Sequence, residues 1–424
     1  MRRNDLQLLA TLAIAWGMPA LLVRAGDSPS FVFPAYHSKN PVDPKNYGNH
    51  DILSTVPPYR LELIAGMTYL YNSNTTQLSN GTGASVGIFD FGFDIGSRDQ
   101  QRVGAFWNLD YRGQAFLYED AVSRAGRDSL EHRLGTRLGL NGAKTSIVFE
   151  ADYHANNAND VNFDKFDREA RRAQSDDYDL SARLVRELPR GSFEIGGGYS
   201  LRDFRAATLL NDGSRTYGDV ALYHQPGFAP KTHLGFGLEA GVDDFDLNLR
   251  QTYVTPSFRW RYRMSGKTSF HGSVGTQFRD VDGPGGIDTE ALVYRGGVQW
   301  AATGKTHFDL EFYRDVNPSY VLGGESYEGT GFRLKSTHQL PGRFVLGAHV
   351  GYEKADYFAS QVGVVSTRED DYFRLGVDLS RPVRLTDRLH GDFSVFYHYN
   401  ENQSNVNFVE FEQHLVGVRL GFHY

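Results

Sequence analysis

From Arg60 to the end of the sequence, apolar and polar residues alternate in stretches of about ten, and this pattern limits the fold more than any other feature. Phe89, Phe91 and Phe93 alternate with Asp90 and Asp94, for example. Successive side chains of a β-strand point to opposite faces, so each stretch has one apolar and one polar face. The pattern therefore predicts an all-β fold.

The breaks between these stretches alternate in length, as they do in outer-membrane barrels with tight periplasmic turns and longer external loops. Counting the stretches predicts a transmembrane antiparallel up-and-down β-barrel of about 18 strands, with 16–18 as the expected range. An even number of strands places both termini on the periplasmic side. We expect short breaks near 96–101, 141–144, 188–191, 226–230, 265–267, 303–305, 340–342 and 385–387, and long breaks near 72–83, 114–129, 155–174, 205–215, 242–248, 281–287, 316–325, 355–369 and 400–406.

The surroundings of the strands follow from hydrogen bonding. Hydrocarbon offers no partners for backbone N–H and C=O groups, and a sheet satisfies all of them only when it is closed. After residue 25, no apolar run approaches the ~20 residues of a membrane-spanning helix. The chain is then either soluble outside the cytoplasm or a barrel in the outer membrane of a Gram-negative envelope. The alternation favours the barrel, with outer-membrane lipid on its apolar face.

The first residues are typical of a secretory leader. Arg2 and Arg3 precede an apolar stretch, and Ala25 offers a small-residue cleavage site. A retained membrane anchor is the alternative. The expected organisation is a signal peptide over 1–25, an irregular periplasmic segment over 26–59 and the outer-membrane β-barrel over 60–424.

The final stretch places Val416, Val418, Leu420, Phe422 and Tyr424 on one face. A terminal aromatic residue after alternating apolar residues resembles the C-terminal signal of bacterial outer-membrane barrels. The resemblance implies that the barrel assembly machinery recognises this strand during insertion. An ordinary amphipathic edge strand is the alternative.

Two Gly-Lys-Thr tripeptides, at 266–268 and 304–306, suggest a phosphate-binding loop. Such a loop needs a glycine five positions before its Gly-Lys pair, and the chain has Arg261 and Gln299 at those positions. Alternating residues follow both tripeptides, where a phosphate loop would open a helix. We therefore expect both tripeptides to form tight turns between strands.

Composition limits the chemistry further. The chain contains no cysteine, which excludes disulfides, thiolate catalysis and cysteine-bound zinc. Its net charge of −7 argues against a nucleic-acid partner. The sequence has neither a G-x-S-x-G nor an H-E-x-x-H motif, and the acidic stretch 156–177 lacks the spacing of a calcium loop. We predict no enzyme activity, no catalytic residue, no cofactor and no metal site.

The polar face of each stretch supplies the candidate functional residues, because it would line the lumen. Both signs of charge occur there, and we expect many of them to pair across strands. The alternative is a solvated wall with no particular ligand. The candidates are Asp90, Asp94, Asp110, Arg112, Arg137, Glu150, Asp152, Arg183, Arg259, Arg261, Arg263, Arg295, Asp309, Glu311, Arg333, Lys335, Arg374 and Asp378.

Arg259, Arg261 and Arg263 are distinctive because they project from one face of one stretch. A row of arginines would guide an anionic solute or polymer by charge. The same three residues come just before the short break at 265, so they would equally well line the periplasmic rim.

Residues 60–81, RLELIAGMTYLYNSNTTQLSNG, resemble the opening strand and first loop of the outer-membrane β-barrel porin family associated with exopolysaccharide secretion. The resemblance extends in general terms over 60–424, through length, alternation, loop pattern and terminal aromatic residue. It implies a conduit for a polysaccharide or for polar, anionic solutes. A general diffusion porin for small solutes, and a structural or adhesive barrel with a blocked lumen, are the alternatives.

Overall fold

The computed structural model describes residues 59–75, 81–97, 103–119, 129–157, 174–205, 212–246, 249–319, 324–386, 389–407 and 409–424. The predicted signal peptide, and the irregular segment up to residue 58, lie outside the described residues. The barrel begins at Tyr59, one residue before the predicted start. Within the described ranges, no helix has the length and apolar character needed to cross a membrane.

The described residues form 18 β-strands, as the alternation predicts, and one short 3₁₀ turn, η3. The strands are β1 (Tyr59–Asn72), β2 (Ala84–Ser97), β3 (Gly104–Tyr118), β4 (Ser129–Asn141), β5 (Thr145–Asn157), β6 (Gln174–Leu188), β7 (Gly191–Phe204), β8 (Gly213–His224), β9 (Thr232–Phe245), β10 (Gln251–Arg263), β11 (Thr268–Val281), β12 (Thr289–Ala301), β13 (Thr306–Pro318), β14 (Glu325–Gln339), β15 (Val345–Ala359), β16 (Glu369–Arg384), β17 (His390–Ser404) and β18 (Phe411–His423), with η3 (Pro341–Arg343) between β14 and β15.

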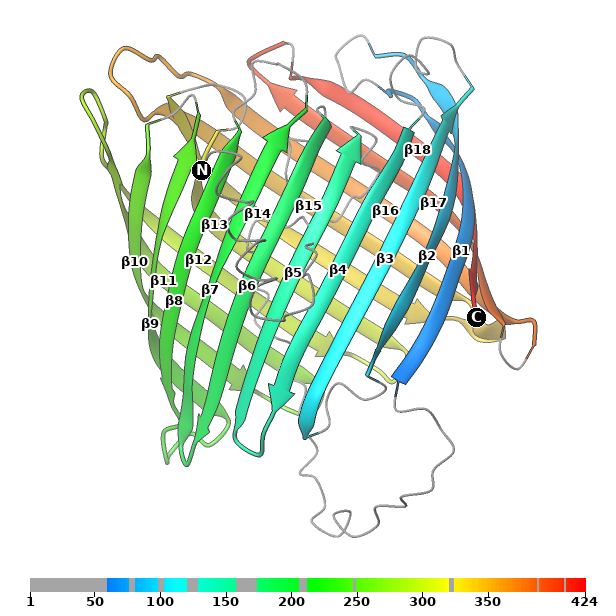
Figure 1. Cartoon of the computed structure of the whole chain (residues 1–424), viewed down its shortest axis with the longest axis horizontal. Coiled ribbons are helices and arrows are strands. Elements are labelled where there is room, and N and C mark those ends of the chain that lie inside the picture. The colour runs from blue at the N-terminus through cyan, green and yellow to red at the C-terminus, as the bar shows by residue number, and fades with distance from the viewer. Residues whose placement is uncertain are drawn as a thin grey trace, which may run out of the picture.

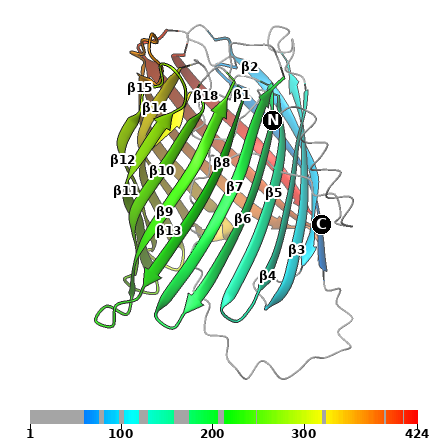
Figure 2. The ribbon, with the colours of Figure 1, turned by 60° about the vertical axis from the view of Figure 1, so that its left-hand side comes forward.

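The strands form one closed sheet. Each pairs antiparallel with its neighbours in sequence, and β1 pairs with β18 to complete the ring (Figure 1). Leu63 and Tyr424 exchange backbone hydrogen bonds of 3.0 and 2.9 Å at this seam. Closure satisfies the backbone groups of strands that would otherwise lie at an edge, which is the condition for crossing hydrocarbon. All strands are inclined to the barrel axis (Figure 2).

The two faces of the strands differ as predicted. Leu63, Met67 and Phe89 are between 44% and 48% exposed on the outside of the barrel. Thr68 and Leu70, which alternate with them on β1, are buried on the inside. The alternation in sequence therefore maps onto an apolar outer face and an inner face that carries most of the charge.

The Gly-Lys-Thr tripeptides lie in tight turns, which confirms the prediction made for them. The Ser265 backbone N–H donates to the Thr268 carbonyl at 3.2 Å, and Thr303 repeats this bond to Thr306 at 3.4 Å. In each turn the first side-chain hydroxyl accepts a 3.1 Å hydrogen bond from the lysine N–H. The tripeptide recurs because the same turn recurs.

The long break expected at 114–129 is wrong at its start, because β3 continues to Tyr118. Phe116 and Tyr118 point inward and pack in an apolar cluster with Leu70, Val86 and Ile88. These inward positions are apolar near the end of the barrel that carries the longer connections, so the polar half of the alternation is lost there. The expected breaks at 242–248, 355–369 and 400–406 also start too early, since β9, β15 and β17 end at Phe245, Ala359 and Ser404.

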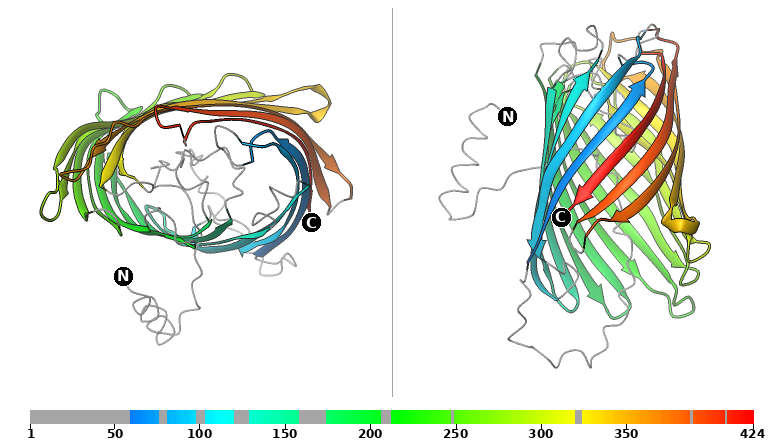
Figure 3. Two further views of the ribbon diagram at one scale, coloured as in Figure 1. Left: turned by 90° about the horizontal axis from the view of Figure 1, so that it is seen from above. Right: turned by 90° about the vertical axis from the view of Figure 1, so that its right-hand side faces the viewer.

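Seen from above, the ring is elongated rather than circular (Figure 3). The short turns gather at one end of the barrel and the longer connections at the other (Figure 1). We call these the short-turn end and the long-loop end.

Candidate functional site

All of the predicted lumen residues lie on the face opposite the exposed apolar side chains. Asp90 accepts a hydrogen bond from Gln114 at 2.5 Å, and Asp94 forms an ion pair with Arg60 at 3.3 Å. Arg137 contacts Glu150 on the next strand at 3.0 Å. Their role in passage stays a prediction. The residues placed on this inner face are Asp90, Asp94, Asp110, Arg112, Arg137, Glu150, Asp152, Arg183, Arg259, Arg261, Arg263, Arg295, Asp309, Glu311, Arg333, Lys335, Arg374 and Asp378.

Two members of the arginine row on β10 are held by carboxylates from other strands. Arg259 donates two hydrogen bonds to Asp219 on β8, at 3.1 and 2.5 Å. Arg261 donates two to Glu194 on β7, at 2.7 and 3.1 Å. Bidentate pairs of this kind fix the guanidinium and neutralise much of its field. Their positive charge therefore faces carboxylates of the wall.

Glu194 lies between two arginines. Arg183 on β6 donates to it at 2.7 Å from the side opposite Arg261. The Arg261 guanidinium also lies 4.1 Å from the ring centroid of Tyr223 and donates to its hydroxyl at 3.2 Å. We call Arg183, Glu194, Tyr223 and Arg261 the short-turn network, because β7 begins and β10 ends near these residues.

Arg263 occupies a different position. It is the last residue of β10, directly before the turn at 264–267, and its backbone N–H donates to the Lys231 carbonyl at 2.9 Å. The predicted row of three arginines is thus divided between the rim of the barrel and the wall inside it. That the row guides an anionic solute stays a prediction.

A second group of charges lies nearer the long-loop end. Asp243 on β9 is fully buried and accepts hydrogen bonds from Arg215 on β8, at 2.5 and 3.1 Å, and from Arg279 on β11, at 2.6 Å. Arg279 also donates to the Gln251 side chain at 2.8 Å. The same group reaches Asn317, which accepts from Arg215 at 3.2 Å.

These contacts join strands that are distant in the sheet. Arg215 and Asn317 lie on β8 and β13, five strands apart, and Gln251 on β10 donates to Ser326 on β14 at 3.3 Å. Neighbouring strands are spaced by about 4.8 Å, so a flat sheet would separate β8 from β13 by roughly 24 Å. The wall must therefore bend sharply here, in agreement with the elongated ring (Figure 3). We call Arg215, Asp243, Gln251, Arg279, Asn317 and Ser326 the corner network.

A third group lies on β12 to β14. Glu311 is 3.8 Å from Arg295 and 3.6 Å from Arg333, and Arg295 also reaches Asp315 at 3.4 Å. Every arginine in the three groups therefore has a carboxylate within salt-bridge distance. The inner wall from β6 to β14 is polar and charged, yet its positive charges are locally compensated.

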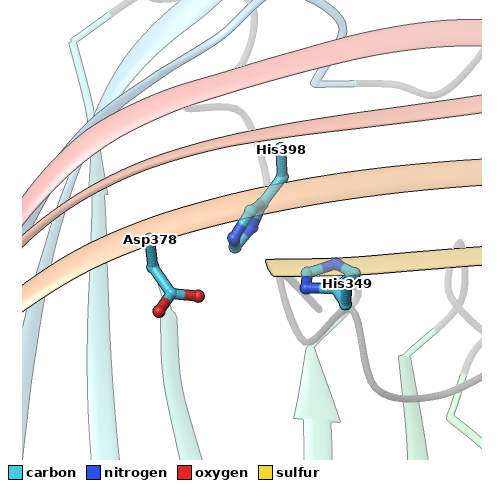
Figure 4. Close-up of side chains that lie close together, drawn as sticks. All are labelled: His349, Asp378 and His398. Atoms are coloured by element: carbon cyan, nitrogen blue, oxygen red, sulfur yellow. The ribbon is translucent and has the colours of Figure 1, made fainter. Parts of the chain in front are cut away.

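The sequence did not single out the carboxylates that hold these arginines. Glu194, Asp219 and Asp243 have the right alternation for the inner face, but each has an arginine partner that lies two or three strands away. Sequence also missed a separate group, in which His349 on β15 and His398 on β17 lie beside the predicted lumen residue Asp378 on β16 (Figure 4). No spacing motif connects these three positions.

Part of the sequence matches a known protein family. Residues 261–424 match the family described as "Putative beta-barrel porin 2". This confirms the resemblance to a β-barrel porin family, although the match lies outside the 60–81 stretch quoted for it and carries no exopolysaccharide association. The matched family is described as a porin family, which favours the prediction that this chain is not an enzyme. Among curated proteins, none matches the sequence.

Several solved structures share the general shape of the barrel. OpdK from Pseudomonas aeruginosa has 12% identity and a TM-score of 0.43, over 86% of this chain and 99% of its own. OccAB2 from Acinetobacter baumannii has 12% identity and a TM-score of 0.44, over 86% and 98%. The siderophore receptor PirA from P. aeruginosa has 8% identity and a TM-score of 0.43, over 88% and 81%. Likenesses at this level carry no inference about what passes through the barrel.

Proposed function

We propose that this outer-membrane barrel is a passive conduit for small polar solutes of either charge sign, because residues 261–424 match a family of β-barrel porins. A closed barrel of 16 to 18 strands leaves an aqueous channel. The observation that supports the absence of a strong charge preference is the pairing of inner-wall arginines with carboxylates. A compensated wall hydrates a solute without repelling either sign.

Ion selectivity in planar bilayers tests this proposal. We expect the purified barrel to conduct without a partner, with a permeability ratio for K⁺ and Cl⁻ near one in a KCl gradient. Replacing Arg259 and Arg261 with Gln removes two positive charges and leaves Asp219 without its arginine and Glu194 with Arg183 alone, so selectivity should move toward cations. A wild-type barrel with strong anion selectivity would show that the arginines act as an uncompensated guide and would overturn the proposal.

Passage of an anionic exopolysaccharide is the second candidate. The feature that favours it is Arg263 at the rim, in line with Arg259 and Arg261 on the same face of β10. An acidic polysaccharide such as polygalacturonate should then interrupt the current when added on the short-turn side, and Arg263→Gln should weaken the block. Equal block from a neutral dextran of the same length would remove this candidate.

A blocked lumen is the remaining alternative for a structural or adhesive barrel. Such a barrel would show no conductance in bilayers while cells that display it still bind surfaces. The bilayer experiment separates this outcome from both conduits.

We also propose that residues 1–25 are removed, that 26–58 lie in the periplasm, and that the short-turn end faces the periplasm. The absence of cysteine makes single-cysteine labelling clean. In intact cells, Val365→Cys in the long connection before β16 should react with an impermeant maleimide, and Lys305→Cys in the short turn before β13 should not. Reversed labelling would invert the orientation, and N-terminal sequencing of the mature chain checks the cleavage.

A further inference from the structure

Three neighbouring strands bring two imidazoles and a carboxylate together on the inner face. His349, Asp378 and His398 come from β15, β16 and β17, and one ligand atom of each lies within 4.8 Å of the others. Figure 4 shows the three side chains converging from separate strands. All three are partly exposed on the lumen side, away from the corner and short-turn networks.

Gly376 allows the two imidazoles to approach. In the strand register, His349 and His398 both pair with Gly376, one from each side. Their backbones are two strand spacings apart, about 10 Å, yet their ring centroids are only 5.2 Å apart. A Cβ on Gly376 would lie 2.1 Å from His349 Cε1 and 2.7 Å from His398 Cδ2. Both rings thus lean over Gly376, which has no side chain to block them.

Gly347 has the same relation to the carboxylate. It pairs with Asp378, and a Cβ there would lie 2.0 Å from Asp378 Oδ2. The carboxylate therefore leans over β15, toward the strand that carries His349. The His398 ring also contacts the ring of Phe396 on the same strand, with centroids 5.1 Å apart. Two glycines and one aromatic ring thus position the three groups.

We propose that His349, Asp378 and His398 form a binding site for a divalent transition-metal ion in the wall of the lumen. Metal–nitrogen bonds of about 2.0–2.1 Å place ligand atoms roughly 3–4 Å apart, and a small side-chain rotation brings the three groups to that separation. Two imidazoles and one carboxylate suit Zn²⁺ and similar ions, whereas Ca²⁺ and Mg²⁺ prefer oxygen ligands alone. Three protein ligands leave coordination positions open to water or a solute in the lumen.

The untagged, refolded full-length barrel is first treated with a chelator, and calorimetric titration with ZnCl₂ then tests the site. We expect one Zn²⁺ per barrel. His349→Ala or His398→Ala should weaken binding at least about tenfold, since loss of a direct ligand costs no less than loss of an outer-shell partner. Co²⁺ should give visible absorption bands that are lost in the same variants.

Two further variants separate a built site from adventitious binding by histidines. Gly376→Ala removes no ligand but forces the rings apart, so it should weaken Zn²⁺ binding as well. His271→Ala, an inward-facing histidine on β11, should leave binding unchanged. Heat-modified mobility on gels checks that each variant folds. The site does not exist if Zn²⁺ binds the double variant His349→Ala/His398→Ala as well as it binds the wild type, or if Zn²⁺ binds neither protein. Both outcomes can be read without measuring conductance.

Discussion

Asp243 is the residue on which the bend in the wall should depend most. It is fully buried and accepts hydrogen bonds from Arg215 and Arg279, which lie on strands to either side of β9. Asn at this position keeps the shape and removes the charge, so two guanidiniums would face an amide. Removing one partner of a buried ion pair typically costs about 3–5 kcal/mol. Because Arg279 also bonds Gln251 and the Val316 carbonyl, we expect a value near the lower limit, about 3 kcal/mol.

The assay is equilibrium unfolding in urea from lipid vesicles, followed by tryptophan fluorescence. With a urea dependence of about 1–3 kcal/mol per molar, a loss of about 3 kcal/mol lowers the midpoint by roughly 1 M or more. Asp244→Asn is the matched control, because Asp244 is the next residue on β9, is exposed and points to the opposite face. Its effect should stay within about 0.5 kcal/mol.

A double-mutant cycle isolates the interaction. Arg279→Gln in the Asp243→Asn background should cost much less than Arg279→Gln alone, since the partner charge is already gone. Equal unfolding midpoints for Asp243→Asn and Asp244→Asn would refute the argument that the corner network stabilises the bend.

Three other predictions follow from the packing. Gly237→Ala should destabilise the barrel by about 1–3 kcal/mol, because a Cβ there would lie 2.2 Å from Arg259 Nε. Gly266→Ala, in the open Ser265–Thr268 turn, should be nearly neutral. The midpoints of urea unfolding of the two variants and the wild type measure the difference. Leu238→Arg on the outer face of β9 should cost about 2–4 kcal/mol in vesicles, and Phe228→Arg in the short turn about 0–1 kcal/mol. If the assembly machinery recognises this strand, the double variant Phe422→Ala/Tyr424→Ala should reduce the amount of folded barrel in the outer membrane at equal synthesis. Heat-modified mobility on gels measures that amount, and an unchanged amount would argue against this partner.

The strand number and the two faces could be predicted because both depend on a local period of two. Phe89 and Asp90 reveal their faces within one stretch of sequence, and the recurrent Gly-Lys-Thr turn reveals where strands end. The prediction was wrong where this local pattern stops, at Phe116 and Tyr118, since their inward apolar side chains imitate the loss of alternation expected of a loop.

The contacts of the inner wall could not be predicted in the same way. Arg261 reaches Glu194 across three strands, and Arg215 reaches Asn317 across five. Such pairs depend on how the closed sheet curves, which no single strand encodes. The His349 and His398 pair depends on a glycine between them, and this becomes visible only when the register of β15, β16 and β17 is known.

The elongated outline of the ring has a consequence for the size of the opening. Strand number and stagger fix the circumference of a closed barrel, and for a given circumference a circle encloses the largest area. A flattened barrel therefore has a smaller bore than its strand number suggests, and the side-chain contacts that hold its sharp bend help to set that bore. Weakening these contacts would let the outline become rounder and the opening become wider, although the number of strands stays the same.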